Sequence, residues 1–188
     1  MNLRISNRRV GPITSAVAIS TLCTAVSAGN PVSAVGESAL KFEATGPAGL
    51  KINGESSGIR AAEADGKLKF TAPTTQFHTG IGLRDKHLRE AIEAEKHPDT
   101  TLVVDRSAIK LPDGAAPTSG KATGSLTLHG VTRPTPFSYT ITKKGDAYQV
   151  HGDLAVNLVE HSIKKPCYLG VCVNEVIKVA ADLTVRGP

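Results

Sequence analysis

The chain has 188 residues, of which 21% are charged and 40% are apolar, and its formal net charge is +5. The apolar fraction is too high and the net charge too small for a disordered chain. No apolar run outside the N-terminus reaches the length of about 18 residues that a membrane-spanning helix needs. Eighteen glycines and eleven prolines indicate many turns rather than long helices.

The first 28 residues have the features of an export signal. They carry Arg4, Arg8 and Arg9 and no acidic residue, and an apolar stretch runs from Val10 to Val26. The stretch ends in Val26-Ser27-Ala28, small residues of the kind that a signal peptidase reads. The pattern predicts a cleaved signal peptide, with a buried N-terminal helix as the less favoured alternative.

The predicted cleavage site sets the expected boundaries between the segments of the chain. We expect a signal peptide over residues 1–28, a linker over 29–37 and one domain over 38–188, in a periplasmic or secreted protein. A second run of small residues, Val32-Ser33-Ala34, makes cleavage after Ala34 an alternative. Removal of the three arginines leaves 19 basic against 17 acidic residues, a net charge of +2. No nucleic-acid partner is therefore expected.

Export also bears on the cysteines. Without Cys23 the mature chain keeps Cys167 and Cys172, which lie on either side of an expected turn at Gly170. An even pair in an oxidising compartment favours a disulfide. A metal site is the less favoured alternative, because a metal needs two more ligands and His161 is the single candidate nearby.

Alternation of apolar and polar residues with a period of two dominates the mature chain. It is typical of antiparallel strands with one buried (dry) face and one solvent-exposed (wet) face. It is clearest in five segments: Leu40–Ala44, Leu68–Ala72, Phe137–Ile141, Tyr148–Leu158 and Val173–Val185. Turn signals separate the strands, at Asn53-Gly54, Asp65-Gly66, Asp113-Gly114 and Lys144-Gly145-Asp146.

One segment, Asp85–Lys96, has a helical pattern instead. Leu88, Ala91 and Ile92 recur at helical spacing. Asp85 can cap the start of this helix, and Pro98 follows its end.

These elements predict an all-β antiparallel fold of about eight to ten strands with one short helix near residues 85–96. The pattern alone leaves a barrel and a two-sheet sandwich open. In a barrel, the dry faces would surround a cavity. The candidate lining residues are Leu68, Phe70, Phe137, Tyr139, Ile141, Tyr148, Val150, Leu154 and Val156.

Two blocks of the sequence resemble the YceI-like family of exported bacterial proteins. The first runs from Thr79 through Arg84-Asp85-Lys86-His87-Leu88 to His97-Pro98, and the second is Gly124-Ser125-Leu126-Thr127-Leu128-His129-Gly130-Val131-Thr132-Arg133-Pro134. The resemblance covers roughly Leu40 to Val185. It implies a lipocalin-like antiparallel barrel with an elongated apolar cavity that holds polyisoprenoids or other long-chain lipids.

The chain departs from the family pattern in two places. Ala91-Ile92 stands where the family often has paired Phe, and the segment Asn157–Ser162 stands where it often has Arg and then Asp-Phe-Gly. Because these positions lie at the expected cavity and rim, the departures bear on the ligand more than on the fold.

The resemblance also implies that the helix covers one mouth of the barrel. Arg84, His87 and Arg133 are then candidates for contact with a lipid head group. A structural role for Asp85, tying the loop to the barrel wall, is favoured, and the same role for Arg84 is left open.

No catalytic or metal-binding motif is recognised in the sequence. The six histidines, at 78, 87, 97, 129, 151 and 161, show no H-x-H or H-E-x-x-H spacing, so structural roles are favoured over metal ligation. His151 and Asp153 share the wet face of one strand and are expected to pair. The sequence thus predicts a binding protein for a long-chain lipid or isoprenoid, with no enzyme activity, metal or cofactor. The alternative is a stress-response or structural barrel with a closed core. The oligomeric state, including a dimer, is left open.

Overall fold

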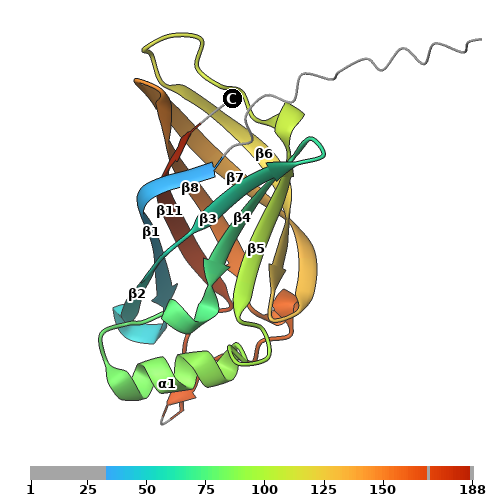
Figure 1. Ribbon diagram of the computed structural model, residues 1–188. Helices are drawn as coiled ribbons and strands as arrows, with labels where there is room; N and C mark the ends of the chain where they lie inside the picture. The colour runs from blue at the N-terminus through green and yellow to red at the C-terminus, as the bar shows by residue number, and fades with distance from the viewer. Residues whose placement is uncertain (1–32, 169, 187–188) are drawn as a thin grey trace, which may run out of the picture.

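The computed structural model describes residues 33–168 and 170–186, so the predicted signal peptide lies outside the described residues. Nine strands form one antiparallel sheet in this part of the chain (Figure 1). They are β1 (Ser33–Thr45), β2 (Lys51–Ser57), β3 (Arg60–Ala64), β4 (Lys67–Pro73), β5 (Asp99–Asp105), β6 (Thr118–Leu128), β7 (Val131–Lys144), β8 (Ala147–Asn157) and β11 (Val176–Arg186).

The sheet closes on itself as an eight-strand barrel. Its order is β11-β8-β7-β6-β5-β4-β3-β1-β2, and β1 also pairs with β11 over Ser33–Ala44. Strands β2 and β3 follow one another along the same edge of β1 and so fill one position in the barrel. The prediction of an all-β antiparallel barrel is confirmed, and the closure excludes the sandwich alternative. β1 begins at Ser33, inside the stretch 29–37 expected as a linker.

The predicted turn at Asn53-Gly54 is wrong. Both residues lie inside β2, opposite Glu43 and Phe42 of β1. The Phe42 ring lies over Gly54, and a Cβ at position 54 would overlap this ring and come within 2.8 Å of the His78 carbonyl oxygen. Glycine is therefore present here for close packing rather than for a turn. The other turn signals do separate strands or lie in the loop before β6.

The helix is present but displaced from its predicted bounds. α1 spans Gly82–Ala91 rather than residues 85–96. Asp85 does not cap its start; it lies in the first turn, and Ile81 occupies the N-cap position without a capping side chain. The helix ends well before Pro98 because Glu93 has a positive φ of 46°, a left-handed conformation that stops helical hydrogen bonding.

Figure 1 shows α1 lying across the lower end of the barrel. Below it, β9 (Cys167–Tyr168) and β10 (Val171–Cys172) form a small hairpin. Short 3₁₀ helices join the strands: η1 (Pro47–Gly49), η2 (Thr74–Gln76), η3 (Arg106–Ala108) and η4 (Val159–His161). Among the described residues, no helix has the length and hydrophobicity to cross a membrane.

Two clusters of buried side chains fill parts of the interior. One lies at the end beside α1 and comprises Ile92, Ala94, Leu126, Leu128, Val156, Leu158 and Ile163. The other comprises Ile59, Leu68, Ala72, Leu183 and Val185. Both Ile92 and Leu158 belong to the segments where the sequence departs from the family pattern, and both are core residues here.

Candidate functional site

An apolar cavity of about 220 Å³ lies inside the barrel. Successive side chains of a strand point to opposite sides, so each strand contributes every second residue to the wall. The nine candidate lining residues predicted from the sequence all line this cavity: Leu68, Phe70, Phe137, Tyr139, Ile141, Tyr148, Val150, Leu154 and Val156. Their contact with a lipid stays a prediction.

The cavity is long and narrow. Tyr148 and Val156 both line it, and eight residues of extended strand cover about 26 Å. Its volume lies below the range of about 300–1,000 Å³ that is usual for sites of drug-sized ligands. A space of this form suits a thin flexible chain rather than a compact ring system.

The two ends of the cavity differ in chemistry. At the end beside α1, the apolar side chains Leu88 and Ile92 line it. At the other end of β5 it reaches Arg106, Ile109 and Leu111. Among the described lining residues, Arg106 alone carries a charge, so the polar end of the cavity lies opposite the helix.

Arg106 is held in place by two contacts. Its Nη1 donates a hydrogen bond of 2.9 Å to the carbonyl oxygen of Ile109. Its Nε lies 3.9 Å from Oε1 of Glu63, and both side chains are about three-quarters buried. Because a guanidinium has five N–H donors, these contacts leave donors for a ligand.

One further polar group belongs to the wall. Thr100 lines the cavity, and its buried hydroxyl has no hydrogen-bond partner within residues 33–168 and 170–186. An unpaired buried hydroxyl destabilises the fold by roughly 1–3 kcal/mol, so a polar atom of a ligand or a water molecule at this point would be favoured.

The three predicted head-group residues do not line the cavity. Arg84 donates to Thr79, through Nε to Oγ1 at 2.7 Å and through Nη2 to the carbonyl oxygen at 2.9 Å. Arg133 donates through Nε to the carbonyl oxygen of Glu160, and His87 is exposed on α1. Arg84 thus ties the loop before α1 in place, and a head-group role for these residues stays a prediction.

Asp85 has a structural role, but it ties α1 to the loop before it rather than the loop to the barrel wall. It is buried, and its Oδ1 accepts hydrogen bonds from the hydroxyl of Thr79 and from the Thr79 N–H at 2.6 Å. The Thr79 hydroxyl bond is the main cause that lowers the pKa of Asp85 below its ordinary value. Thr79 is therefore held by hydrogen bonds to two residues of the first turn of α1, Arg84 and Asp85.

His151 forms the predicted surface pair with Asp153 and gains a second partner. Its Nε2 lies 3.1 Å from Asp153 Oδ2, and its Nδ1 lies 2.7 Å from Asp182 Oδ1. The hydrogen bond to Asp182 is the main cause that raises the pKa of His151. The two carboxylates contact opposite nitrogens of the ring, so this group does not form a common metal site.

The disulfide prediction is confirmed. Cys167 and Cys172 are joined, with Cα atoms 4.0 Å apart across the β9–β10 hairpin. The alternative of a metal site with His161 is excluded, because both sulfur atoms are used. His161 is buried and hydrogen-bonds through Nδ1 to the carbonyl oxygen of Val131 instead.

A larger hollow, of about 940 Å³, lies against the other side of the wall. Phe42, Phe137, Leu154 and Val179 contribute to both spaces, but the outer hollow also includes charged side chains: Lys41, Glu43, Glu55, Lys121, Asp153 and Lys178. The outer hollow is open and carries charged side chains, whereas the interior cavity is lined almost entirely by apolar atoms, so the smaller interior cavity is the better site for an apolar ligand.

Sequence reasoning missed Arg106 and one cluster of side chains. No pattern in the sequence marks Arg106 as a cavity residue. It begins η3, after the end of β5, so the alternation of a strand does not predict the direction of its side chain. The cluster of Glu93, His97 and His129 joins parts of the chain that are far apart. The spacing of four residues between Glu93 and His97 is the one sequence signal that could have drawn attention to it.

A closed antiparallel barrel of about eight strands is one of the folds whose interior can hold a small ligand. Residues 33–185 match the YceI-like domain. The chain therefore belongs to the YceI-like family, as its two sequence blocks predict.

Solved structures share this fold. A polyisoprenoid-binding domain from Saccharophagus degradans, implicated in plant cell wall breakdown, matches with a TM-score of 0.69 and 15% identity over 84% of this chain and 98% of that one. BcnA of Burkholderia cenocepacia matches with a TM-score of 0.62 and 14% identity, over 78% and 95% of the two chains. At these identities the likeness shows the fold alone.

Curated relatives match over a shorter stretch. A UPF0312 protein of Vibrio parahaemolyticus is 38% identical over 77 residues, which cover 38% of this chain and 36% of the relative. A UPF0312 protein of Vibrio campbellii matches to the same extent. The match thus spans about a third of the length of these relatives.

Proposed function

We propose that the chain is an exported carrier that holds one long-chain lipid or polyisoprenoid in the barrel cavity, in the periplasm or outside the cell. The observation that carries this proposal is the narrow apolar cavity inside a closed barrel, with the charged side chain of Arg106 at one end. The polyisoprenoid-binding domain from Saccharophagus degradans, which has the same fold, supports the chemical class of the ligand.

The affinity for such a ligand would come from its apolar chain. Each square ångström of apolar surface removed from water contributes about 25 cal/mol, and a narrow cavity surrounds a thin chain on all sides. The polar end of the ligand would lie at Arg106, where the guanidinium is already paired with Glu63. A neutral or weakly polar acceptor, such as a hydroxyl or carbonyl, fits this pair better than a strong anion, which Glu63 would repel.

Mass spectrometry of an organic extract tests the proposal. The full chain is purified from its own host, and the extract is compared with that of two interior variants, Val150→Glu and Leu154→Arg. We expect a long-chain lipid or isoprenoid in stoichiometric amount with the wild-type protein and little with the variants, because a buried charge would face the chain.

The matched control is Gln149→Glu, which places a charge on the same strand but on its exposed face. Circular dichroism shows which variants are folded. Equal ligand content in folded interior variants and in the control would exclude the cavity as the site. A wild-type extract without ligand would favour the closed-core alternative, in which the protein acts through its surface.

A further inference from the structure

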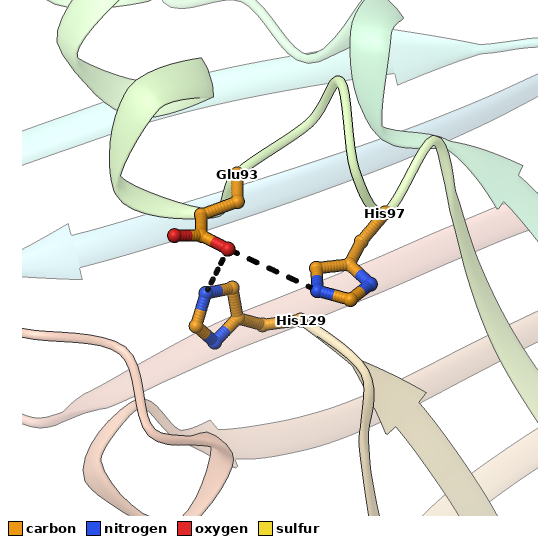
Figure 2. Close-up of side chains that lie close together, drawn as sticks. All are labelled: Glu93, His97 and His129. Atoms are coloured by element: carbon orange, nitrogen blue, oxygen red, sulfur yellow. Dashed lines mark ion pairs between the residues drawn. The ribbon is translucent and has the colours of Figure 1, made fainter.

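Three side chains from separate parts of the chain meet beside the lower end of the barrel (Figure 2). Glu93 follows α1, His97 precedes β5, and His129 lies in the turn between β6 and β7. Oε2 of Glu93 lies 3.6 Å from Nε2 of His129 and 4.0 Å from Nε2 of His97. All three ligand atoms lie within 4.8 Å of one another, and each residue is partly buried.

The hydrogen bonding of His129 fixes which of its nitrogens can bind a metal. Nδ1 lies 3.1 Å from the carbonyl oxygen of His161, which can only accept, so this nitrogen carries the hydrogen. In the neutral ring, Nε2 then presents a lone pair to the carboxylate of Glu93. Two acceptors that face each other need a proton or a cation between them. A backbone carbonyl bonded to the other ring nitrogen is also the usual way in which metal-binding histidines are oriented.

Two of the three residues have unusual backbone conformations. Glu93 and His129 have positive φ values of 46° and 52°, a region that residues other than glycine rarely adopt and that is often found at functional sites. Gly130 lies directly beside the third residue, and a Cβ there would come within 2.7 Å of Cε1 of His97. The local backbone thus favours the approach of all three side chains.

We propose that Glu93, His97 and His129 form a binding site for a divalent transition metal ion of the Zn²⁺ class. Two imidazole nitrogens and one carboxylate oxygen form a donor set that Zn²⁺ uses together with a water molecule. Ca²⁺ and Mg²⁺ are disfavoured, because they prefer oxygen ligands throughout. Tetrahedral ligands about 2.0–2.1 Å from the metal are roughly 3.4 Å apart, so small side-chain rotations close the site.

The site would connect two parts of the fold. Glu93 and His97 belong to the connection between α1 and β5, whereas His129 belongs to the β6–β7 turn. A bound ion would therefore fasten the segment that covers the lower end of the barrel to the barrel wall. The site does not depend on which ligand the cavity holds.

Lys96 competes for the same oxygen. Its Nζ lies 3.1 Å from Oε2 of Glu93, and this hydrogen bond is the main cause that lowers the pKa of the carboxyl. A metal must displace the ammonium or share the carboxylate with it. Replacement of Lys96 by a neutral residue is therefore expected to strengthen metal binding.

Titration with Zn²⁺ against a chromophoric chelator tests the site. The full chain is produced without a histidine tag and stripped of metal by dialysis. We expect one Zn²⁺ per chain, and a loss of affinity of about tenfold or more in Glu93→Gln and in His97→Gln. Lys96→Met should bind more tightly than the wild type. Co²⁺ used as a probe should give the absorption bands of a tetrahedral site in the wild type and lose them in His97→Gln.

His151→Gln is the matched control, since His151 is an accessible histidine that also has carboxylate neighbours. Its Zn²⁺ affinity should equal that of the wild type. The proposal is overturned if the wild type binds no Zn²⁺, or if Glu93→Gln and His97→Gln bind it as the wild type does. Glu93→Gln and His97→Gln are expected to fold, because both side chains are at least one-third exposed.

Discussion

His129 and His161 join two chain reversals through a pair of hydrogen bonds. Nδ1 of His129 donates to the carbonyl oxygen of His161 at 3.1 Å, and Nδ1 of His161 donates to the carbonyl oxygen of Val131 at 3.0 Å. His161 is only 2% exposed. The β6–β7 turn and η4 are thus fixed to each other at the end of the barrel beside α1.

We expect His161→Phe to destabilise the protein by about 1–3 kcal/mol, because it removes the donor to the Val131 carbonyl and places a somewhat larger aromatic ring in the buried site. Urea unfolding followed by circular dichroism measures this. His87→Phe, on the exposed face of α1, is the control and should change stability by about 0.5 kcal/mol at most. Equal effects of the two changes would show that the His161 hydrogen bond contributes nothing specific.

The contact between Phe42 and Gly54 gives a second expectation. Gly54→Ala should destabilise the fold by about 1–3 kcal/mol, because the new Cβ meets the Phe42 ring and the His78 carbonyl oxygen. Phe42→Leu in the same chain should recover part of this loss. Gly114→Ala, where a Cβ meets nothing within 4 Å, is the control. A Gly54→Ala protein as stable as the control would contradict this account of β2.

The contacts of His151 give a pH dependence. Asp182, and then Asp153, raise the pKa of His151 above its ordinary value of 6.5. A raised pKa in the folded state means that protonated His151 stabilises the fold fully below about pH 6.5 and that this stabilisation is lost as pH rises through the folded-state pKa. Asp182→Asn should therefore reduce stability at pH 5.5 more than at pH 9.

An NMR titration of the His151 ring measures the pKa directly, and it should fall in Asp182→Asn. Because the side chain is 46% exposed, solvent screening keeps the effect on stability small. Asp146→Asn, at an exposed turn, should leave the titration unchanged. A pKa that is the same in all three proteins would show that the carboxylate does not act on His151.

Arg106 and Arg133 are alternative head-group contacts, and they can be separated. We expect Arg106→Met to lower the amount of lipid retained after purification, with a loss of affinity of about tenfold for one charge-assisted hydrogen bond. Arg133→Ala should retain lipid as the wild type does, because Arg133 lies outside the cavity lining. The reverse result would favour the head-group site predicted from the sequence over the one at Arg106.

The disulfide closes a short loop, so its effect should be modest. Cys167→Ser is expected to lower stability by about 2 kcal/mol at most without preventing folding. Chemical denaturation measures this, and labelling without reductant should find no free thiol in the exported wild-type protein. Two reactive thiols in that protein would contradict the disulfide and the expected oxidising location together.

The barrel wall could be predicted because its information is local. In β8, the dry face from Tyr148 to Val156 alternates with exposed residues, and this period of two fixes the direction of each side chain once the strand forms. The nine lining positions follow from it. The helix bounds could not be predicted, because Asp85 bonds back to Thr79 instead of capping the helix.

Features that depend on contacts between distant parts of the chain could not be predicted from local sequence patterns. The Asn53-Gly54 pair looks like a turn in the sequence, and only the Phe42 ring on the neighbouring strand explains its place in β2. His129 lies 32 residues after His97, and β5 and β6 must pair before the two imidazoles meet. Such contacts depend on tertiary structure, which no local pattern encodes.

We expect the pairing of β1 with β11 to be a late event in folding. Its register joins Ser33 to Arg186, so the last seam of the barrel links the two extremes of the described chain. Contacts this distant form late and slowly, because loop closure must precede them. Until β11 is in place, β1 and β8 both keep an unpaired edge and the interior remains open to water. A hydrophobic ligand that is present during this final step could enter through the open seam, so loading need not wait for a gap in the finished wall.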